Sequence, residues 1–278
     1  MSLPDLEPWI AHMLLIVTSL LAVIAYSCAG YWQGCALLNR PQASKTLVLS
    51  LAALGAVSQA IFLSQGMLTP EGWLLDFVSL SSLMAIVLVS LVVVSSLTRP
   101  LENLLVIILP VAILTLALEW LLPQHGSAKH YHPGVLIHIL ASMLAYALLA
   151  LAGIQALLLA RQDWQLKHHH PSGIVKSLPP LQTMEKLLFE LVWGGMVLLT
   201  LGLLTGFIFV ENLFAQHLVH KTLLSLLAWV LFAILLWGHH RLGWRSRTAV
   251  RWTLGGFILL MLGFFGSKWV LEFVLGSA

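Results

Sequence analysis

Histidine is the residue type in this sequence with the clearest capacity for chemistry, because a neutral imidazole binds haem iron and other metal ions. The chain has twelve histidines among 278 residues. Two of them, His138 and His220, stand near the starts of two different apolar segments. Two imidazoles on separate helices at one depth of a membrane have the geometry of a bis-histidine haem site or of another metal site. His138 and His220 are therefore the candidate cofactor and iron ligands.

Motifs for other kinds of chemistry do not occur in the sequence. It contains no Walker A sequence, no dinucleotide-binding glycine fingerprint, and no HExxH, GxSxG, CxxC or CxxCH motif. Hydrolysis and thiol redox chemistry thus have no candidate residues. The sequence favours a non-enzymatic protein over an enzyme.

The composition indicates the kind of element that must position these histidines. Apolar residues make up 59% of the chain and charged residues only 9%, against about 25% charged residues in an ordinary soluble domain. The apolar residues fall in runs of about twenty, and a helix of that length crosses a hydrocarbon core of about 30 Å. We expect an all-α polytopic membrane helix bundle in which residues 1–278 form a single membrane domain, with the lipid bilayer as its surroundings.

Eight transmembrane helices are expected from these runs. The first is preceded by the acidic residues Asp5 and Glu7, whereas a cleaved signal peptide begins with basic ones, so it is expected to be retained. The expected spans are 9–36, 46–66, 74–97, 102–122, 134–160, 186–210, 219–240 and 250–273.

The positions of the basic residues predict the orientation of these spans. Alternate loops hold eleven of the fourteen lysines and arginines, namely Arg40, Lys45, Arg99, Arg161, Lys167, Lys176, Lys186, Arg241, Arg245, Arg247 and Arg251. Because basic loops stay in the cytoplasm, both termini are expected outside, in a bacterial inner membrane. The same placement explains the net charge of +3 without a nucleic-acid partner.

The predicted orientation sorts the histidines by depth. His138 and His220 fall within about a turn of the outer ends of the fifth and seventh spans, and His12 lies at the outer start of the first. A simpler interpretation is that each caps a helix end or bonds a neighbouring backbone group, since an unpaired polar group in hydrocarbon is costly. The run at 168–170 is expected to be a solvated loop, and His239 and His240 to complement a helix C-terminus.

The positions of the glycines, acidic residues and cysteines bear on helix packing, ion transport and disulfide formation. Gly202 and Gly206 form a small-residue groove in the sixth span, and Gly255, Gly256 and Gly263 do so in the eighth, as expected for close helix packing. No acidic residue falls in mid-bilayer, which argues against an ion-coupled transporter. The two cysteines are expected to be reduced core residues, without a disulfide.

The carboxyl-terminal half resembles the CcsA-type cytochrome c assembly proteins, a haem-handling membrane family. The resemblance runs over about residues 134–273 and is carried by ordered segments: Leu136 to His138 with Ser142 and Tyr146, 178–187, Gly195, 198–206, 243–247, 255–257 and 264–266. In this comparison His138 matches the haem-ligating histidine with which a family helix begins.

The sequence also departs from that family. The tryptophan-rich loop of the form WGxxWxWD is missing between the sixth and seventh spans, where the chain has only 211–222, although Lys221 matches the lysine that follows the motif. The second outer histidine after the last span is also missing, and His220 is expected to replace it. This pattern resembles the shorter, eight-span branch of YpjD-like inner-membrane proteins.

Two hypotheses follow. In the first, the chain binds or handles haem of the b type through His138 and His220, with Trp120, Tyr146 and Phe214 beside the macrocycle. In the second, it is a non-catalytic membrane scaffold or accessory subunit of a transporter or assembly complex. Its small-residue grooves and basic loops would then bind other membrane subunits.

Overall fold

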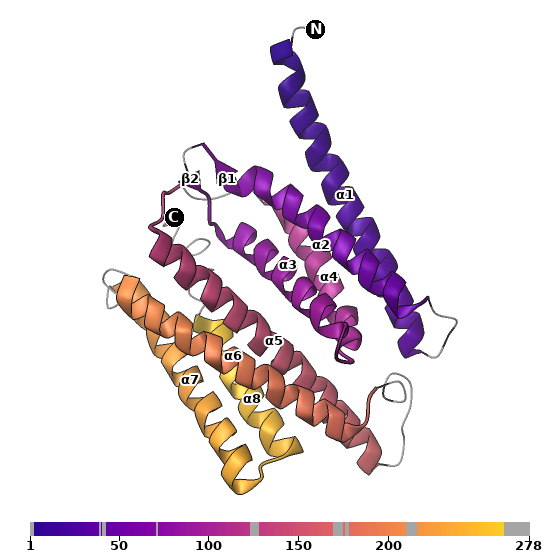
Figure 1. Ribbon diagram of the computed structural model, residues 1–278, viewed down its shortest axis with the longest axis vertical. Helices are drawn as coiled ribbons and strands as arrows, with labels where there is room; N and C mark the ends of the chain where they lie inside the picture. The colour runs from indigo at the N-terminus through magenta and orange to yellow at the C-terminus, as the bar shows by residue number, and fades with distance from the viewer. Residues whose placement is uncertain are drawn as a thin grey trace. The chain divides into compact units, whose positions relative to one another are not determined.

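A computed structural model describes residues 3–38, 40, 43–70, 72–122, 128–168, 175, 178–209 and 216–263, without the side chains of 3–8, 10, 11, 216–218 and 220. The chain divides into two compact units, Met1–His130 and Tyr131–Ala278. Both consist mainly of long helices (Figure 1). Each unit is described by itself below.

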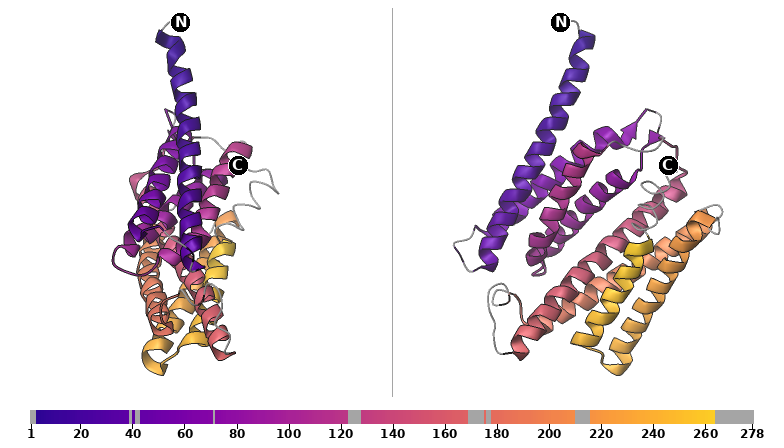
Figure 2. Two further views of the ribbon diagram at one scale, coloured as in Figure 1. Left: turned by 90° about the vertical axis from the view of Figure 1, so that its right-hand side faces the viewer. Right: turned by 180° about the vertical axis from the view of Figure 1, so that it is seen from behind.

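Unit 1 contains the helices α1 (Leu3–Leu37), α2 (Lys45–Met67), α3 (Phe77–Ser96) and α4 (Leu105–Leu121). Helix α1 packs on α2 and α4, and α3 packs on the same two helices, so the four close into a ring. The first part of α1 extends beyond the other helices of this unit (Figure 2). The short 3-10 helix η1 (Glu102–Leu104) leads into α4.

A small sheet connects the helix ends of unit 1. Strands β1 (Leu68–Thr69) and β2 (Gly72–Trp73) form an antiparallel hairpin between α2 and α3. Trp73 also pairs with Lys129, with a backbone hydrogen bond of 3.0 Å in each direction. Gly72 has a φ of 127°, and a Cβ there would lie 2.7 Å from the Lys129 backbone. Only glycine fits this position without strain.

The centre of unit 1 holds a buried hydrogen-bond network that links all four helices. The Tyr26 hydroxyl donates to Gln59 Oε1 at 2.8 Å, and Gln59 Nε2 donates to Ser82 Oγ at 3.0 Å and to Thr115 Oγ1 at 3.2 Å. Tyr26, Gln59 and Ser82 are each 0% exposed. A buried amide needs such partners, and here they come from one residue on each of the other three helices.

Unit 2 contains α5 (Pro133–Lys167), α6 (Leu181–Phe209), α7 (Gln216–Leu242) and α8 (Ser246–Met261). Helix α5 packs on α6 and α8, and α7 packs on the same two, so α5 and α7 are diagonal partners in a second ring. His132 begins α5, because its Nδ1 accepts the backbone N–H of Gly134 at 3.2 Å and Pro133 follows it. Proline suits this first position because it needs no hydrogen-bond partner.

The helices confirm the predicted all-α membrane architecture. Seven helices in the described part of the chain are long and apolar enough to cross a membrane, and α8 is described over 16 residues. Their bounds differ from the predicted spans mainly around the long connection. Helix α5 continues to Lys167 and α6 begins at Leu181, so Arg161, Lys167 and Lys186 lie on helices. Both cysteines are free; Cys35 is buried, as predicted for a core residue, whereas Cys28 is exposed, so the prediction of a core position was wrong for Cys28.

Candidate functional site

His138 lies in the second turn of α5 and faces α6. Its Nδ1 lies 2.8 Å from the backbone oxygen of Gly202. A carbonyl only accepts, so Nδ1 carries the proton and donates it. The Thr205 hydroxyl, 3.4 Å from the same nitrogen, donates to the carbonyls of Leu201 and Gly202. The neutral ring then has its lone pair on Nε2, which is the nitrogen that can bind a metal ion.

Two glycines let the imidazole approach α6 closely. A Cβ at Gly206 would lie 2.9 Å from His138 Cε1, and a Cβ at Gly202 would lie 2.9 Å from the hydroxyl of Ser142. About two turns further along α5 and back along α6, such matches continue, with Leu149 against Gly195. The groove predicted at Gly202 and Gly206 is thus filled by this chain's own α5.

Only one of the two ring nitrogens of His138, Nδ1, is hydrogen-bonded to a described residue. In the part of the chain that the structure describes, Nε2 of His138 has no hydrogen-bond partner. The His138 residue is neither fully buried nor fully exposed. The interpretation that His138 bonds a neighbouring backbone group is correct for Nδ1, and it is compatible with metal binding through Nε2.

His220 lies in the first turn of α7, but its side chain is outside the described residues. The pairing of His138 with His220 therefore stays a prediction. Phe214, one of the three aromatic residues expected beside the macrocycle, is likewise outside the described residues. Trp120 belongs to unit 1, where its ring stacks on Phe62.

Tyr146 lies two turns along α5 from His138 and is 7% exposed. Its hydroxyl donates to the sulfur of Met261 at 2.5 Å, and its ring packs against Phe257 with a centroid distance of 6.0 Å. Both contacts are with α8. Tyr146 thus belongs to the packed interface between α5 and α8, two turns along α5 from His138.

The remaining histidines have different roles. His132 caps α5 and its ring stacks on Phe209. His12 is exposed on α1 of unit 1. His168 is exposed and its Nδ1 donates to Trp164 O at 2.8 Å, whereas His169 and His170 lie outside the described residues. No group of three or more His, Cys, Asp or Glu residues that could hold a metal ion occurs within the described ranges.

His239 repeats the hydrogen-bond pattern of His138 at the other end of unit 2. Its Nδ1 donates to the backbone oxygen of Trp244 at 2.9 Å, and its ring stacks on Phe189 with a centroid distance of 3.5 Å. This contact fixes the turn after α7; the acceptor is Trp244 O, which lies beyond the helix end at Leu242. Its geometry makes it a matched control for His138.

The sequence did not reveal which groups hold the His138 ring. Gly202, Thr205 and Gly206 contact it, but the sequence marks the glycines only as general packing positions. These contacts follow from the antiparallel register of α5 and α6, which brings the end of α6 beside the start of α5. Nothing in the sequence marks the buried network around Gln59 either, because a neutral polar residue inside an apolar run does not indicate its partners on other helices.

Taken together, the helices define a polytopic helical membrane protein, with a histidine held by a backbone carbonyl near the start of α5. The chain belongs to the cytochrome c assembly protein family, whose model matches residues 73–275. This match begins well before the segment 134–273 that carries the resemblance in the sequence.

Relatives of known source agree with this assignment. The chain is 32% identical over 261 residues to the inner membrane protein YpjD of Escherichia coli K12, which covers 93% of this chain and 99% of the relative. It is 34% identical over 189 residues to an uncharacterized 28.8 kDa protein of Azospirillum brasilense, with 66% and 69% covered. It is 25% identical over 134 residues to protein HemX of Brevibacillus brevis, with 48% and 49% covered.

No solved structure matches this chain. The family match and the membrane-spanning helices identify a multi-pass inner-membrane protein related to cytochrome c biogenesis proteins.

Proposed function

We propose that this chain binds haem at the end of unit 2 where α5 and α7 begin, with His138 and His220 as the axial ligands of a b-type haem. The observation that carries the proposal is the 2.8 Å hydrogen bond from His138 Nδ1 to Gly202 O. Ligating histidines almost always donate their other ring N–H in this way, which fixes the tautomer and the ring orientation. The residues present therefore fit one axial position.

The register of the helices supports His220 as the second ligand. Trp229 Nε1 donates to Thr200 Oγ1 at 3.0 Å, so these two residues of α7 and α6 lie side by side. His220 precedes Trp229 by nine residues and Phe209 follows Thr200 by nine, a distance of about 14 Å along each helix. Phe209 packs against Gly134, one turn from His138. The start of α7 is therefore close in depth to the start of α5.

The ring of helices provides a second supporting argument. Helices α5 and α7 face each other across unit 2, because each packs on both α6 and α8. Cofactors in helix bundles are held by side chains that project inward from facing helices. A haem held there supplies a redox-active or transferable iron porphyrin. The protein's part is to keep Nε2 of His138 unprotonated and oriented.

The scaffold hypothesis has less support in the contacts. Three of the glycine positions that would offer grooves to another subunit are filled from within unit 2: Gly206 by His138, Gly202 by Ser142, and Gly256 by Phe232. Haem binding is therefore the function that the described residues favour.

The test is an absorption spectrum of the chain purified in detergent from cells supplied with a haem precursor. We expect a Soret band and about one haem per chain by the pyridine haemochrome assay, with b-type α-band positions. His138→Ala and His220→Ala are each expected to remove most of the bound haem, because each deletes one axial ligand.

His239→Ala is the matched control, since its imidazole makes the same kind of bond at the other end of unit 2. It is expected to keep the wild-type haem content. A colourless wild-type protein, or spectra unchanged by both ligand substitutions, would contradict the proposal. Equal loss in all three variants would also contradict it, because the loss would then report on folding.

A further inference from the structure

The turn between α7 and α8 is held in a fixed conformation. The backbone N–H of Trp244 donates to Gly238 O at 3.2 Å, and His239 Nδ1 donates to Trp244 O at 2.9 Å. The Trp244 ring stacks on Trp252 of α8 with a centroid distance of 5.4 Å and covers Gly238. Gly243 has a φ of 63°, which lets the chain reverse direction. Arg245 in this turn and Arg247 in the first turn of α8 are therefore attached to backbone of defined conformation.

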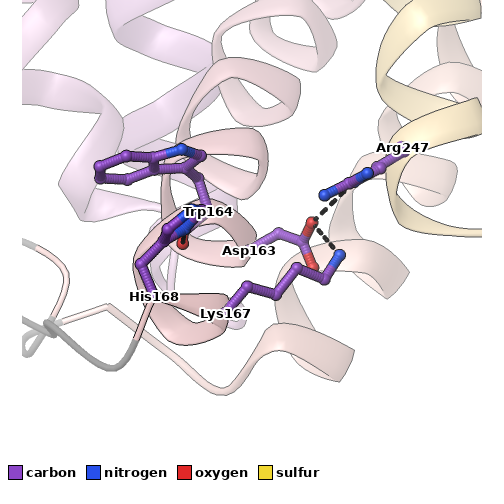
Figure 3. Close-up of polar contacts among 5 residues, drawn as sticks. All are labelled: Asp163, Trp164, Lys167, His168 and Arg247. Carbon is purple, nitrogen blue, oxygen red and sulfur yellow. Dashed lines mark hydrogen bonds and ion pairs between the residues drawn. The ribbon is translucent and has the colours of Figure 1, made fainter.

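Two arginines extend from this turn over buried carboxylates. Arg247 Nε lies 3.6 Å from Asp163 Oδ2, which also accepts a hydrogen bond of 2.6 Å from Lys167 (Figure 3). Arg245 Nε lies 3.9 Å from Glu185 Oε1. The arginine side chains are 70% and 79% exposed, whereas those of Asp163 and Glu185 are 12% and 15% exposed. The two arginine side chains are thus accessible at the surface, whereas the two carboxylates are largely covered.

The geometry leaves the outer edges of both guanidinium groups available. Each carboxylate lies near the Nε atom, and the terminal amino groups of Arg245 and Arg247 make no hydrogen bond to any residue that the structure describes. A guanidinium carries five N–H donors and binds phosphate with two parallel hydrogen bonds. Arg245 and Arg247 are separated in the sequence only by Ser246, so together they offer donors for an anion with several oxygen atoms.

The charge around the turn has the sign that such an anion requires. Seven basic and three acidic side chains are described at this end of unit 2: Arg161, Lys167, Lys186, Arg241, Arg245, Arg247 and Arg251 against Asp163, Glu185 and Glu190. Exposed apolar side chains adjoin the turn, with Trp237 59% and Leu242 57% exposed. Tryptophan at this position is typical of the headgroup level of a bilayer.

We propose that the α7–α8 turn binds the phosphate group of an anionic phospholipid through Arg245 and Arg247. The exposed apolar surface beside the turn accommodates acyl chains, which a soluble anion lacks. Basic side chains next to a membrane surface attract anionic lipids. Guanidinium groups that bond the phosphate directly add charge-assisted hydrogen bonds, and their loss from both arginines is expected to weaken binding by about thirtyfold. The proposal is independent of the haem site, which lies at the other end of unit 2.

Native mass spectrometry of the detergent-purified chain tests the proposal. The protein is titrated separately with phosphatidylglycerol, with phosphatidylcholine and with inorganic phosphate. We expect the wild type to bind phosphatidylglycerol in strong preference to phosphatidylcholine, and inorganic phosphate in excess not to displace it. Arg245→Gln combined with Arg247→Gln is expected to weaken phosphatidylglycerol binding by about thirtyfold.

Arg161→Gln combined with Lys186→Gln is the matched control, because both residues are exposed at the same end but lie outside the turn. It is expected to retain most of the phosphatidylglycerol binding. Equal losses in the two double variants would overturn the proposal, since general electrostatic attraction by the basic residues at this end would then explain the binding. Displacement by inorganic phosphate, or unchanged binding in the turn variant, would overturn it as well.

If the double variant Arg245→Gln and Arg247→Gln does not remain monodisperse in detergent, Arg245→Lys combined with Arg247→Lys is tested in its place. This pair keeps both charges and removes only the paired guanidinium donors. We expect a clear loss of preference for phosphatidylglycerol over phosphatidylcholine. Binding equal to the wild type would contradict recognition by the arginines.

Discussion

At the scale of single residues, the most informative contact is the one between His138 and α6. Its energetic value as a hydrogen bond is modest, about 1 kcal/mol. Its chemical effect is larger, because it decides which nitrogen of the ring holds the proton. A histidine with the same neighbours in sequence but no carbonyl beside Nδ1 would lack this preference. The orientation of the ring depends in turn on the absence of a side chain at Gly206.

Gly206→Ala tests this dependence. The added Cβ would lie 2.9 Å from His138 Cε1, so the ring must shift or α5 and α6 must separate. Overpacking of this kind costs about 1–3 kcal/mol. Loss of a group that orients a metal ligand lowers affinity about tenfold to a hundredfold. We expect haem affinity to fall within that range, measured by competition with apomyoglobin.

Gly255→Ala is the control for this substitution. A Cβ there would have its nearest neighbour 3.9 Å away, in Leu231, so alanine fits without a shift. It is expected to leave haem affinity unchanged. If Gly206→Ala behaved in the same way, the ring would not depend on this close approach.

At the scale of the helices, both units combine close approach at small residues with buried hydrogen bonds: Gly55 lies against Tyr26 in unit 1, and the buried amide of Gln155 donates to Met184 O in unit 2. Unit 2 has further close approaches at Gly195, Gly202 and Gly256. Unit 1 has a buried amide at its centre, with partners on the other three helices. In lipid, helices gain little from apolar burial alone, so close packing and hydrogen bonds determine which helices associate.

Gln59→Leu is expected to destabilise unit 1 by about 1–3 kcal/mol, because it leaves the buried hydroxyl of Tyr26 without its acceptor. The measurement is the thermal unfolding midpoint in detergent, followed by intrinsic fluorescence. Haem content should remain at the wild-type level, since the substitution lies outside unit 2. Gln65→Leu, on the same helix, removes only a bond to Ile61 O at an exposed position and should have little effect. Equal midpoints for the two variants would contradict a stabilising role for the network.

At the scale of the whole molecule, the family match and the predicted orientation both apply to the membrane-spanning helices of the two units. Residues 73–275 match the family model, so the match includes helices of both units. The orientation of these spans remains a prediction from the positions of the basic residues. It requires the α7–α8 turn to face the cytoplasm and the start of α5 to face outward.

Cysteine labelling in spheroplasts tests this orientation. In a chain with Cys28 and Cys35 replaced by alanine, His130→Cys and His240→Cys each place one thiol at an exposed position. We expect a membrane-impermeant maleimide to label His130→Cys in intact spheroplasts, and His240→Cys only after lysis. The reverse pattern would require both termini to be inside.

The sequence alone determined the class of structure and most element bounds. Runs of about twenty apolar residues require helices in lipid, because a helix satisfies every backbone hydrogen bond within itself. This local requirement can be seen in composition, and so can a histidine near the start of a predicted span. The resemblance over 134–273 likewise indicated the family that the match later established.

Only the tertiary structure decided which groups meet. That Gly202 O accepts from His138, that Gln59 joins four helices, and that Asp163 lies beneath Arg247 all depend on the register between helices distant in sequence. Register is set by the packing of side chains along the whole length of two helices, so no single residue encodes it. The apolar pattern that marks a span is similar on all sides of a membrane helix, and it does not specify which side faces a partner.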